Sequence, residues 1–299
     1  MIVNQANLRE LTVGYSAAFN KALGETKSEY QKIATVVPSS TAENSYKWLG
    51  QTPGLREWIG EREIQHMDSY GYAIRNRKFE RTIAIPRDDI EDDQYGIYTP
   101  AFSAMGEAAA VHPDELTFGL LTKGFTEKCY DGKPFFASDH KSGEKTFGNR
   151  GTKKFNRDTY IEARTSIMSI TGDKGRALNL VPDLLVVSPK YEMDAREVLM
   201  AEQIDGTSNV LKGTAELMVT TQLAGANEDM WFLLCTRKFL KPLIYQIRKQ
   251  IKFVQLTKDD DLNVFMHDEF LYGADGRSNA GFGFWQMAWG SDGTVAANG

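Results

Sequence analysis

Apolar residues recur at helical spacing in two long stretches of the chain, 4–23 and 86–125. The first stripe consists of Leu8, Leu11, Tyr15, Ala18, Phe19, Ala22 and Leu23, and Gly24 closes it. The second consists of Tyr98, Phe102, Met105, Ala109, Leu116, Leu120, Leu121 and Phe125. Pro113 interrupts the second stripe, so the pattern predicts one long helix kinked there or two helices that meet there.

Carboxylates crowd the start of the second stretch, at Asp88, Asp89, Glu91, Asp92 and Asp93. Carboxylates before an apolar helical stripe suit a helix N-terminus, where free N–H groups and the positive end of the dipole attract anions. We therefore expect the cluster to begin the long helix. A divalent cation site built from these carboxylates is the alternative.

The segment 46–85 alternates short strand patterns with turn signals at 51–54 and 69–71, and charges are interleaved throughout. This pattern predicts a long antiparallel ribbon. A lone two-stranded ribbon is marginally stable in water, so something must cover Trp48 and Trp58. The N-terminal helix likewise needs a surface for its apolar side, either its own body or a neighbour's. We expect both pieces to rest on identical copies of the chain.

The second half of the chain alternates helix and strand patterns. Asp158 is expected to cap a helix, and the continuous apolar run within 183–189 fits a buried strand that leads into a helix over 191–203. Strands over 216–223 and 230–236 flank a turn. Together these elements predict a compact α/β unit.

The last part of the chain is basic, then acidic, then aromatic. Residues 237–252 hold six basic side chains and no acid among alternating apolar positions, and an acidic hinge follows at 259–261. The aromatic and glycine-rich segment 265–289 predicts strands that return to the first part of the chain. One domain would then be discontinuous in sequence.

Composition narrows the class of protein. At 299 residues the chain favours two sub-domains, and its 41% hydrophobic and 25% charged residues are ordinary for a globular protein. A net charge of −5 argues against binding nucleic acid through bulk positive charge. Cys129 and Cys235 are expected to be ordinary reduced thiols. Neither a signal peptide nor an apolar run long enough to span a membrane is evident, so synthesis in the cytoplasm is expected.

The sequence offers little catalytic chemistry. Of the four histidines, His267 is the one followed by two carboxylates, Asp268 and Glu269, and phosphate-loop, nucleophile-elbow and zinc-protease motifs are absent from the sequence. We therefore predict no catalytic residue, no metal site and no cofactor. Two alternatives stay open: a metal-dependent hydrolase that uses the acidic clusters, and a DNA-binding module that uses the basic segments 141–164 and 237–252.

Several rare clusters together resemble one family. They are Tyr46-x-Trp48-Leu-Gly50, Glu57-Trp58, Arg87-Asp-Asp-x-Glu-Asp-Asp93, Gly96-Ile-Tyr98, Ala109-Ala-Val-x-Pro-Asp-Glu-Leu116, Cys129-Tyr-Asp-Gly132, Phe265-Met-x-x-Glu-Phe-Leu-x-Gly-Ala274 and Gly283-Phe-Trp-Gln-Met287. In this order they resemble the major head subunit of Mu-like phages, over nearly the whole chain. That family is similar to the Hong Kong 97 type of capsid fold.

The resemblance implies an α+β capsid fold with four regions: an N-arm over 1–45, an extended loop over 46–85, a peripheral domain with the spine helix over 86–175 and 237–299, and an axial domain over 176–236. It implies a structural protein of the virion, without catalysis, that self-assembles into an icosahedral shell of hexamers and pentamers. The implied partners are packaged double-stranded DNA bound non-specifically on the inner face, the portal, and in some systems scaffold or decoration proteins. A membrane is not among them.

The predicted contacts between subunits lie on the ribbon. They are Trp48, Arg56, Glu57, Trp58, Arg62, Arg75 and Arg77. Mixed charges could set the register between neighbours, while tryptophans at the centre of an interface contribute about 2 kcal/mol or more each. Accordingly, Trp58→Ala is expected to weaken shell assembly more than it lowers the melting temperature of the monomer. Equal losses in both measurements would count against this role.

Overall fold

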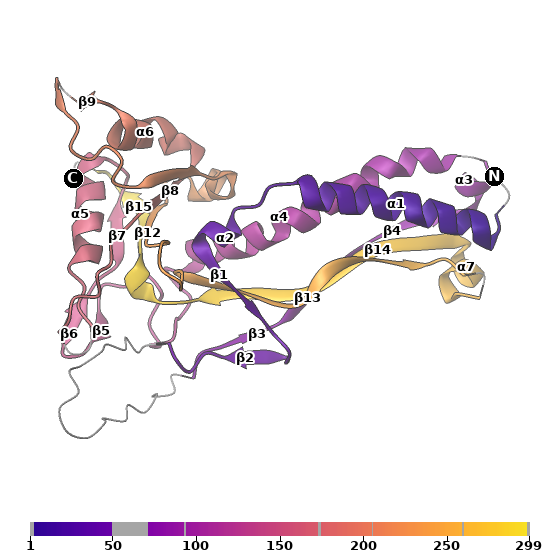
Figure 1. Cartoon of the computed structure of the whole chain (residues 1–299), viewed down its shortest axis with the longest axis horizontal. Helices are drawn as coiled ribbons and strands as arrows, with labels where there is room; N and C mark the ends of the chain where they lie inside the picture. Colours follow the sequence, from indigo (N-terminus) through magenta and orange to yellow (C-terminus); the bar gives the residue numbers. More distant parts are fainter. Residues whose placement is uncertain are drawn as a thin grey trace.

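The computed structural model describes residues 3–49, 71–92, 94–172, 175–204, 206–258 and 260–297. The molecule is elongated (Figure 1). A five-stranded sheet with two helices forms one end, and a four-stranded sheet with two long helices forms a body that extends away from it. None of the helices in the described residues is long and apolar enough to cross a membrane.

The four-stranded sheet has the order β1-β13-β14-β4. Its strands are β1 (Ala34–Pro38), β13 (Leu243–Leu256), β14 (Glu269–Phe282) and β4 (Arg77–Pro86). β13 and β14 form a long antiparallel hairpin, β14 pairs with β4, and β1 runs parallel to β13. The predicted return of the late strands to the first part of the chain is confirmed.

One uninterrupted helix, α4 (Thr99–Lys123), crosses this sheet with Pro113 inside it. The single-helix alternative of the sequence prediction is therefore right. α1 (Gln5–Glu25) begins at Asn4, whose side chain accepts a hydrogen bond from the backbone N–H of Asn7. α1 lies along α4 on the same side of the sheet (Figure 1).

The fit between these two helices depends on Gly106 of α4. A Cβ atom there would lie 2.3 Å from the carbonyl oxygen of Phe19, so only glycine permits this approach. Tyr15 and Phe19 of α1 are buried in the contact, and the Tyr15 ring stacks on Phe102 at 4.3 Å. The prediction that the N-terminal helix rests on another copy is wrong for this structure, because its apolar side is covered by its own body.

The acidic cluster does not begin the long helix, which corrects the sequence prediction. Asp88 and Asp89 lie in the first turn of a separate short helix, α3 (Arg87–Glu91). A 3-10 turn, η1 (Gln94–Tyr98), follows, and α4 then starts with Pro100 in its first turn and without a side-chain cap. Carboxylates therefore still occupy a helix N-terminus, but that of a different helix.

The five-stranded sheet has the order β11-β8-β12-β15-β7. Its strands are β11 (Glu216–Val219), β8 (Leu184–Val187), β12 (Trp231–Leu234), β15 (Ala288–Val295) and β7 (Arg150–Lys153). β8 is buried along its whole length, as its continuous apolar run predicted. It lies between β11 and β12, so these two predicted strands do not pair with each other.

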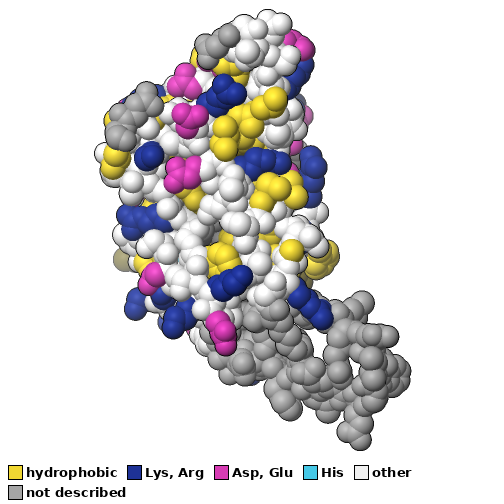
Figure 2. All heavy atoms as spheres, turned by 90° about the vertical axis from the view of Figure 1, so that its left-hand side faces the viewer, with side chains coloured by type: hydrophobic (Ala, Val, Ile, Leu, Met, Phe, Trp, Pro, Cys, Tyr) yellow, Lys and Arg dark blue, Asp and Glu magenta, His cyan; other side chains and the backbone are white. Residues whose placement is uncertain are grey.

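Two helices belong to this end, α5 (Arg157–Met168) and α6 (Glu192–Met200). α5 is capped by Asn156, which exchanges hydrogen bonds with Thr159. The prediction of Asp158 as the cap was wrong by two positions, because the reciprocal pair satisfies two backbone donors that a lone carboxylate would not. Figure 2 shows the outer surface of this end, where basic, acidic and apolar side chains are interspersed.

The remaining elements are short. They are α2 (Tyr30–Ile33), β2 (Glu43–Ser45), β3 (Ala73–Arg75), β5 (His140–Ser142), β6 (Lys145–Phe147), η2 (Pro189–Tyr191), β9 (Gln203–Ile204), β10 (Thr207–Ser208), η3 (Thr221–Leu223), η4 (Gly225–Asn227), α7 (Leu262–His267) and η5 (Trp285–Met287). β2 and β3 pair antiparallel. They form the base of the predicted ribbon, whose remainder over 50–70 lies outside the described residues.

Candidate functional site

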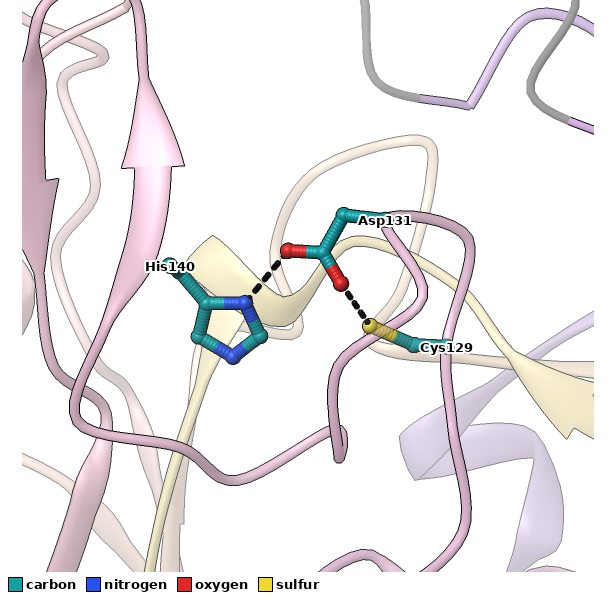
Figure 3. Close-up of side chains that lie close together, drawn as sticks. All are labelled: Cys129, Asp131 and His140. Atoms are coloured by element: carbon teal, nitrogen blue, oxygen red, sulfur yellow. Dashed lines mark hydrogen bonds and ion pairs between the residues drawn. The ribbon is translucent and has the colours of Figure 1, made fainter.

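The loop that follows α4 brings together three side chains of chemical interest, Cys129, Asp131 and His140 (Figure 3). The Asp131 carboxylate lies between the other two. One of its oxygens is 2.6 Å from Nδ1 of His140, and the other accepts a hydrogen bond from the Cys129 thiol at 3.2 Å. The His140 ring is fully buried and stacks on Trp285 with a centroid distance of 4.2 Å.

Both ring nitrogens of His140 face acceptors, because Nε2 lies 3.2 Å from the carbonyl oxygen of Phe135. A proton on Nδ1 lets the ring donate to the Asp131 carboxylate. Burial raises the pKa of the Asp131 carboxyl, but the hydrogen bonds from His140, Lys133 and Cys129 outweigh burial, so the net pKa lies below its usual range. The cluster is therefore a buried carboxylate that accepts hydrogen bonds from an imidazole, a backbone N–H and a thiol.

This arrangement is unsuited to nucleophilic chemistry. The Cys129 thiol donates to Asp131 rather than to the imidazole, and burial together with the neighbouring carboxylate raises its pKa. Such a thiol stays protonated, and the general base that a cysteine nucleophile needs is not hydrogen-bonded to it.

The same three residue types can hold a metal ion, but the distances between them do not suit one. The gap of 2.6 Å between His140 Nδ1 and the Asp131 oxygen is a hydrogen-bond distance. Two ligand atoms on a tetrahedral zinc, each bonded at about 2.0 Å, stand roughly 3.3 Å apart. Hydrogen bonds, rather than a shared metal ion, join the three side chains. The cluster holds the loop over 129–140 against Trp285.

Sequence reasoning missed this cluster. Cys129 was predicted to be an ordinary thiol, Asp131 entered only within the motif Cys129-Tyr-Asp-Gly132, and His140 was given no role, since the eight residues between Asp131 and His140 match no metal-ligand or catalytic spacing. A buried Asn149 bridges the same loop to the late strands, through amide hydrogen bonds to the carbonyls of Phe135, Trp285 and Ala288. These long-range partners are not readable from local spacing.

The predicted contacts between subunits divide into three groups. Arg56, Glu57, Trp58 and Arg62 lie outside the described residues. Trp48 is half-buried against its own chain, with ring centroids 5.9 Å from Tyr46 and 5.8 Å from Phe284. Arg75 and Arg77 are exposed and line an open groove of about 500 Å³ beside β14.

The two basic segments do not form one continuous patch. In the first, Arg150 pairs with Asp292 at 2.9 Å and Lys154 with Asp229 at 3.2 Å, so both are partly neutralised within the chain. In the second, Arg237 pairs with Asp183 at 3.7 Å, at the five-stranded end. Arg248, Lys249 and Lys252 of the second segment lie on β13 of the body. These contacts weaken the alternative of a DNA-binding module that uses both segments.

The acidic clusters do not assemble a metal centre in the part of the chain that the structure describes. Within that part, the grouping of Cys129, Asp131 and His140 is the one set of at least three histidine, cysteine or acidic side chains close enough to share an ion. On α3, Arg87 pairs with Glu91 at 3.2 Å, and Asp89 accepts a hydrogen bond from Tyr98. The metal-dependent hydrolase thus gains no support from these residues.

Comparison with known proteins extends over the whole chain. The family of the Mu-like prophage major head subunit gpT matches residues 8–152, 146–223 and 219–299. The chain belongs to this family. The resemblance inferred from the rare sequence clusters is confirmed, and with it the prediction of a structural protein rather than an enzyme.

Individual relatives agree with the family assignment. The major capsid protein of Escherichia phage Mu is 38% identical over 288 residues, which cover 96% of this chain and 74% of that protein. A subunit of the bacteriophage JBD30 procapsid has a TM-score of 0.61 at 38% identity, covering 97% of this chain and 76% of that chain. A chain from the JBD30 capsid decorated with minor capsid protein trimers has a TM-score of 0.57 at 30% identity, covering 65% and 90%. The fold is of the Hong Kong 97 capsid type, as predicted.

Proposed function

We propose that this chain is the major capsid subunit of a Mu-like head and that copies of it assemble into the icosahedral shell of a virion. The observation that carries the proposal is the match to the major head subunit family from residue 8 to residue 299. A procapsid subunit aligned over 97% of the chain supports the same assignment.

The fold suits a shell subunit for a physical reason. Three hydrophobic cores, one on each side of the five-stranded sheet and one between α1, α4 and the four-stranded sheet, hold an elongated shape without a partner. Large apolar side chains nevertheless remain exposed, among them Phe239 and, together on α7, Leu262, Phe265 and Met266. Exposed apolar groups on a protein that folds alone are typical of surfaces that bind partners.

Within the shell, the finer assignments follow the sequence analysis. We assign residues 1–45 to the N-arm, 46–85 to the extended loop, 86–175 and 237–299 to the peripheral domain and 176–236 to the axial domain. The five-stranded sheet suggests one refinement, since β7 and β15 lie in the same sheet as β8, β11 and β12. The axial unit would then include parts of the flanking segments.

The predicted contact residues are not equally suited to contacts between subunits. Arg75 and Arg77 remain candidate contacts because they are exposed beside a groove. The four residues within 56–62 remain candidates from sequence alone. Trp48 is better suited to anchoring the base of the ribbon, because it packs on Tyr46 and Phe284.

Partners other than copies of the chain belong to the same proposal. We expect double-stranded DNA to be held non-specifically on the inner face and one vertex to be occupied by a portal. A decoration protein is an expected outer partner, because a chain 30% identical to this one comes from a capsid decorated with minor capsid protein trimers.

Negative-stain microscopy of the purified full-length chain tests the central proposal. Closed shells, tubes or rings of regular subunits support it. A chain that remains monomeric at high concentration, under conditions that assemble related capsids, contradicts it. Steep salt dependence of DNA binding by that monomer would instead favour the binding-module alternative.

A further inference from the structure

The four-stranded sheet has one covered face and one open face. On β4, the Phe79 ring packs on His112 of α4 at 4.1 Å, so the alternate residues Lys78 and Glu80 point to the other side. On β14, Tyr272 packs against Tyr15 of α1, so Asp275 and Arg277 share that other side. Here the open face means the side of this sheet opposite α1 and α4 (Figure 1), beyond the end where β2 and β3 cover it and Ile74 lies against Gly281.

A row of three cations crosses the open face. The register places Arg277 directly opposite Lys78 on one neighbouring strand and opposite Lys249 on the other. Like charges opposite one another across strands destabilise a sheet, so this row has an energetic cost in the isolated chain. Only Lys249 has an ion-pair partner among the described residues, Asp275, and the buried Nε of Arg277 has no hydrogen-bond acceptor there.

The neighbourhood of the row fits a protein partner better than a nucleic acid. The next row along the sheet is Lys252, Asp275 and Glu80, which places two carboxylates beside the cations. These carboxylates would repel a phosphate backbone, whereas a protein surface can match both signs. Val254, with 44% of its surface exposed, lies two residues from Lys252 on the same face and adds an apolar contact.

The complementary surface is the far tip of the same molecule. α3 and α7 meet there, since the Arg87 N–H donates to the carbonyl of Asp268 at 2.9 Å. This acidic tip is defined by exposed carboxylates around exposed apolar side chains: Asp88, Asp92, Asp260 and Asp268 around Leu262, Phe265 and Met266. Phe265 is 82% exposed. An apolar centre with a charged rim is the usual anatomy of a protein interface.

The tip and the cation row cannot neutralise each other within one copy. The strand from Lys78 to Pro86 spans about 26 Å at roughly 3.3 Å per residue. Charges that far apart are screened from each other at physiological salt, where the Debye length is about 8 Å. Lys78, Lys252, Asp92 and Asp260 also have no ion-pair partner among the residues that the structure describes.

We propose that the acidic tip of one copy docks on the open face of the sheet of the next copy, over the row of Lys78, Arg277 and Lys249. The contact is heterologous, because two different surfaces of the chain meet, so each copy can both donate its tip and receive another. This inference rests on the proposed shell function and names one of its contacts.

Charge reversal of the full-length chain tests the contact. The sheet variant carries Lys78→Glu and Lys252→Glu, the tip variant carries Asp92→Lys and Asp260→Lys, and the swap variant carries all four. All four positions are exposed, so we expect unfolding midpoints close to that of the wild type. The matched control, Lys141→Glu with Lys145→Glu, makes the same charge change as the sheet variant at the five-stranded end.

Particle yield at low salt, measured by sedimentation and negative-stain microscopy, is the readout. The sheet and tip variants are each expected to lose about tenfold or more, since facing like charges are strongly unfavourable at an interface. The swap variant regains most of the yield, and the control retains it. Wild-type yield from both reversed variants, no recovery in the swap variant, or an equal loss in the control each overturns the inference.

Further outcomes distinguish failure of the proposed contact from failure of the proposed shell function. If shells of the sheet variant form normally but lose salt-sensitive DNA retention, the open face binds DNA and the inference is overturned. A wild-type chain that forms no particles refutes the proposed function together with this contact. Normal wild-type shells with unaffected variants refute the contact alone.

Discussion

The two sheets of this molecule bury their strands in opposite ways. In the five-stranded sheet, Leu184 and Val186 of β8 face one core while Leu185 and Val187 face another, so both sides of the strand are covered. In the four-stranded sheet, the side facing α1 and α4 is covered, whereas the opposite side is covered by β2 and β3 at one end only and carries the cation row beyond that end. This difference indicates that the five-stranded sheet buries its strands within one chain, whereas the four-stranded sheet leaves a surface that a partner can bind.

The largest expected effect is the loss of a side chain from the doubly covered sheet. Trp231→Ala removes a fully buried indole that packs on Trp289 and donates to the carbonyl of Lys153 at 3.1 Å. A cavity of this size should lower the free energy of unfolding by about 3 to 5 kcal/mol in chemical denaturation. The control Val254→Ala, on the open face, should change it by less than about 0.5 kcal/mol. Similar losses at both positions would remove the contrast between the two sheets.

The second effect concerns the hydrogen bond between Asp131 and His140 at the junction of the two ends. Asp131→Asn removes the charge that holds His140, and should cost about 2 to 3 kcal/mol at pH 7, measured by urea unfolding. Because the pKa of Asp131 is lowered in the folded chain, its stabilisation is present above the unfolded pKa and is lost as pH falls through the folded pKa. The difference between wild type and variant should therefore shrink below about pH 4. A difference that stays constant with pH would argue against an ionised Asp131.

The third effect concerns the contact between α1 and α4, which covers the apolar side of α1 within the same chain. Gly106→Ala forces α1 away from α4, because the added Cβ would lie 2.3 Å from the Phe19 carbonyl oxygen, and should cost about 2 kcal/mol in thermal unfolding. Gly119→Ala is the matched control in the same helix, where a Cβ meets nothing within 4 Å. Its expected effect is a gain of up to about 1 kcal/mol from helix propensity. Equal behaviour of the two variants would mean that α1 is not seated on α4 in solution.

The smallest effect tests how the N-terminal segment is attached beyond α1. Asp114 of α4 accepts hydrogen bonds from the backbone N–H groups of Glu29 at 2.9 Å and Tyr30 at 2.6 Å. Burial raises the pKa of the Asp114 carboxyl more than these bonds lower it. A raised pKa means that wild-type stability falls, relative to Asp114→Asn, as pH rises from the unfolded pKa through the folded one. Urea unfolding between about pH 3.5 and 6 should show a change of at most about 1 kcal/mol, opposite in sign to that at Asp131.

The local pattern of apolar and polar residues was sufficient to predict the elements that depend on interactions between residues close together in the sequence. The stripes of Leu8 to Leu23 and Tyr98 to Phe125 predicted α1 and α4, and the run Leu184–Val187 predicted a buried strand. Motifs spread along the chain were sufficient for the family, because rare residue clusters in a fixed order are informative without any contact being known.

The sequence by itself therefore determined the helices α1, α4, α5 and α6, several strands, the return of the late strands to the first part of the chain and the class of protein. Only the tertiary structure decided that α1 lies on its own α4, that β8 separates β11 from β12, and that Cys129, Asp131 and His140 meet. The physical reason is the separation along the chain between the residues that interact. Periodicity records which side of an element is apolar, whereas the identity of the surface that covers it depends on close fits such as Gly106 against Phe19, between residues far apart in the chain.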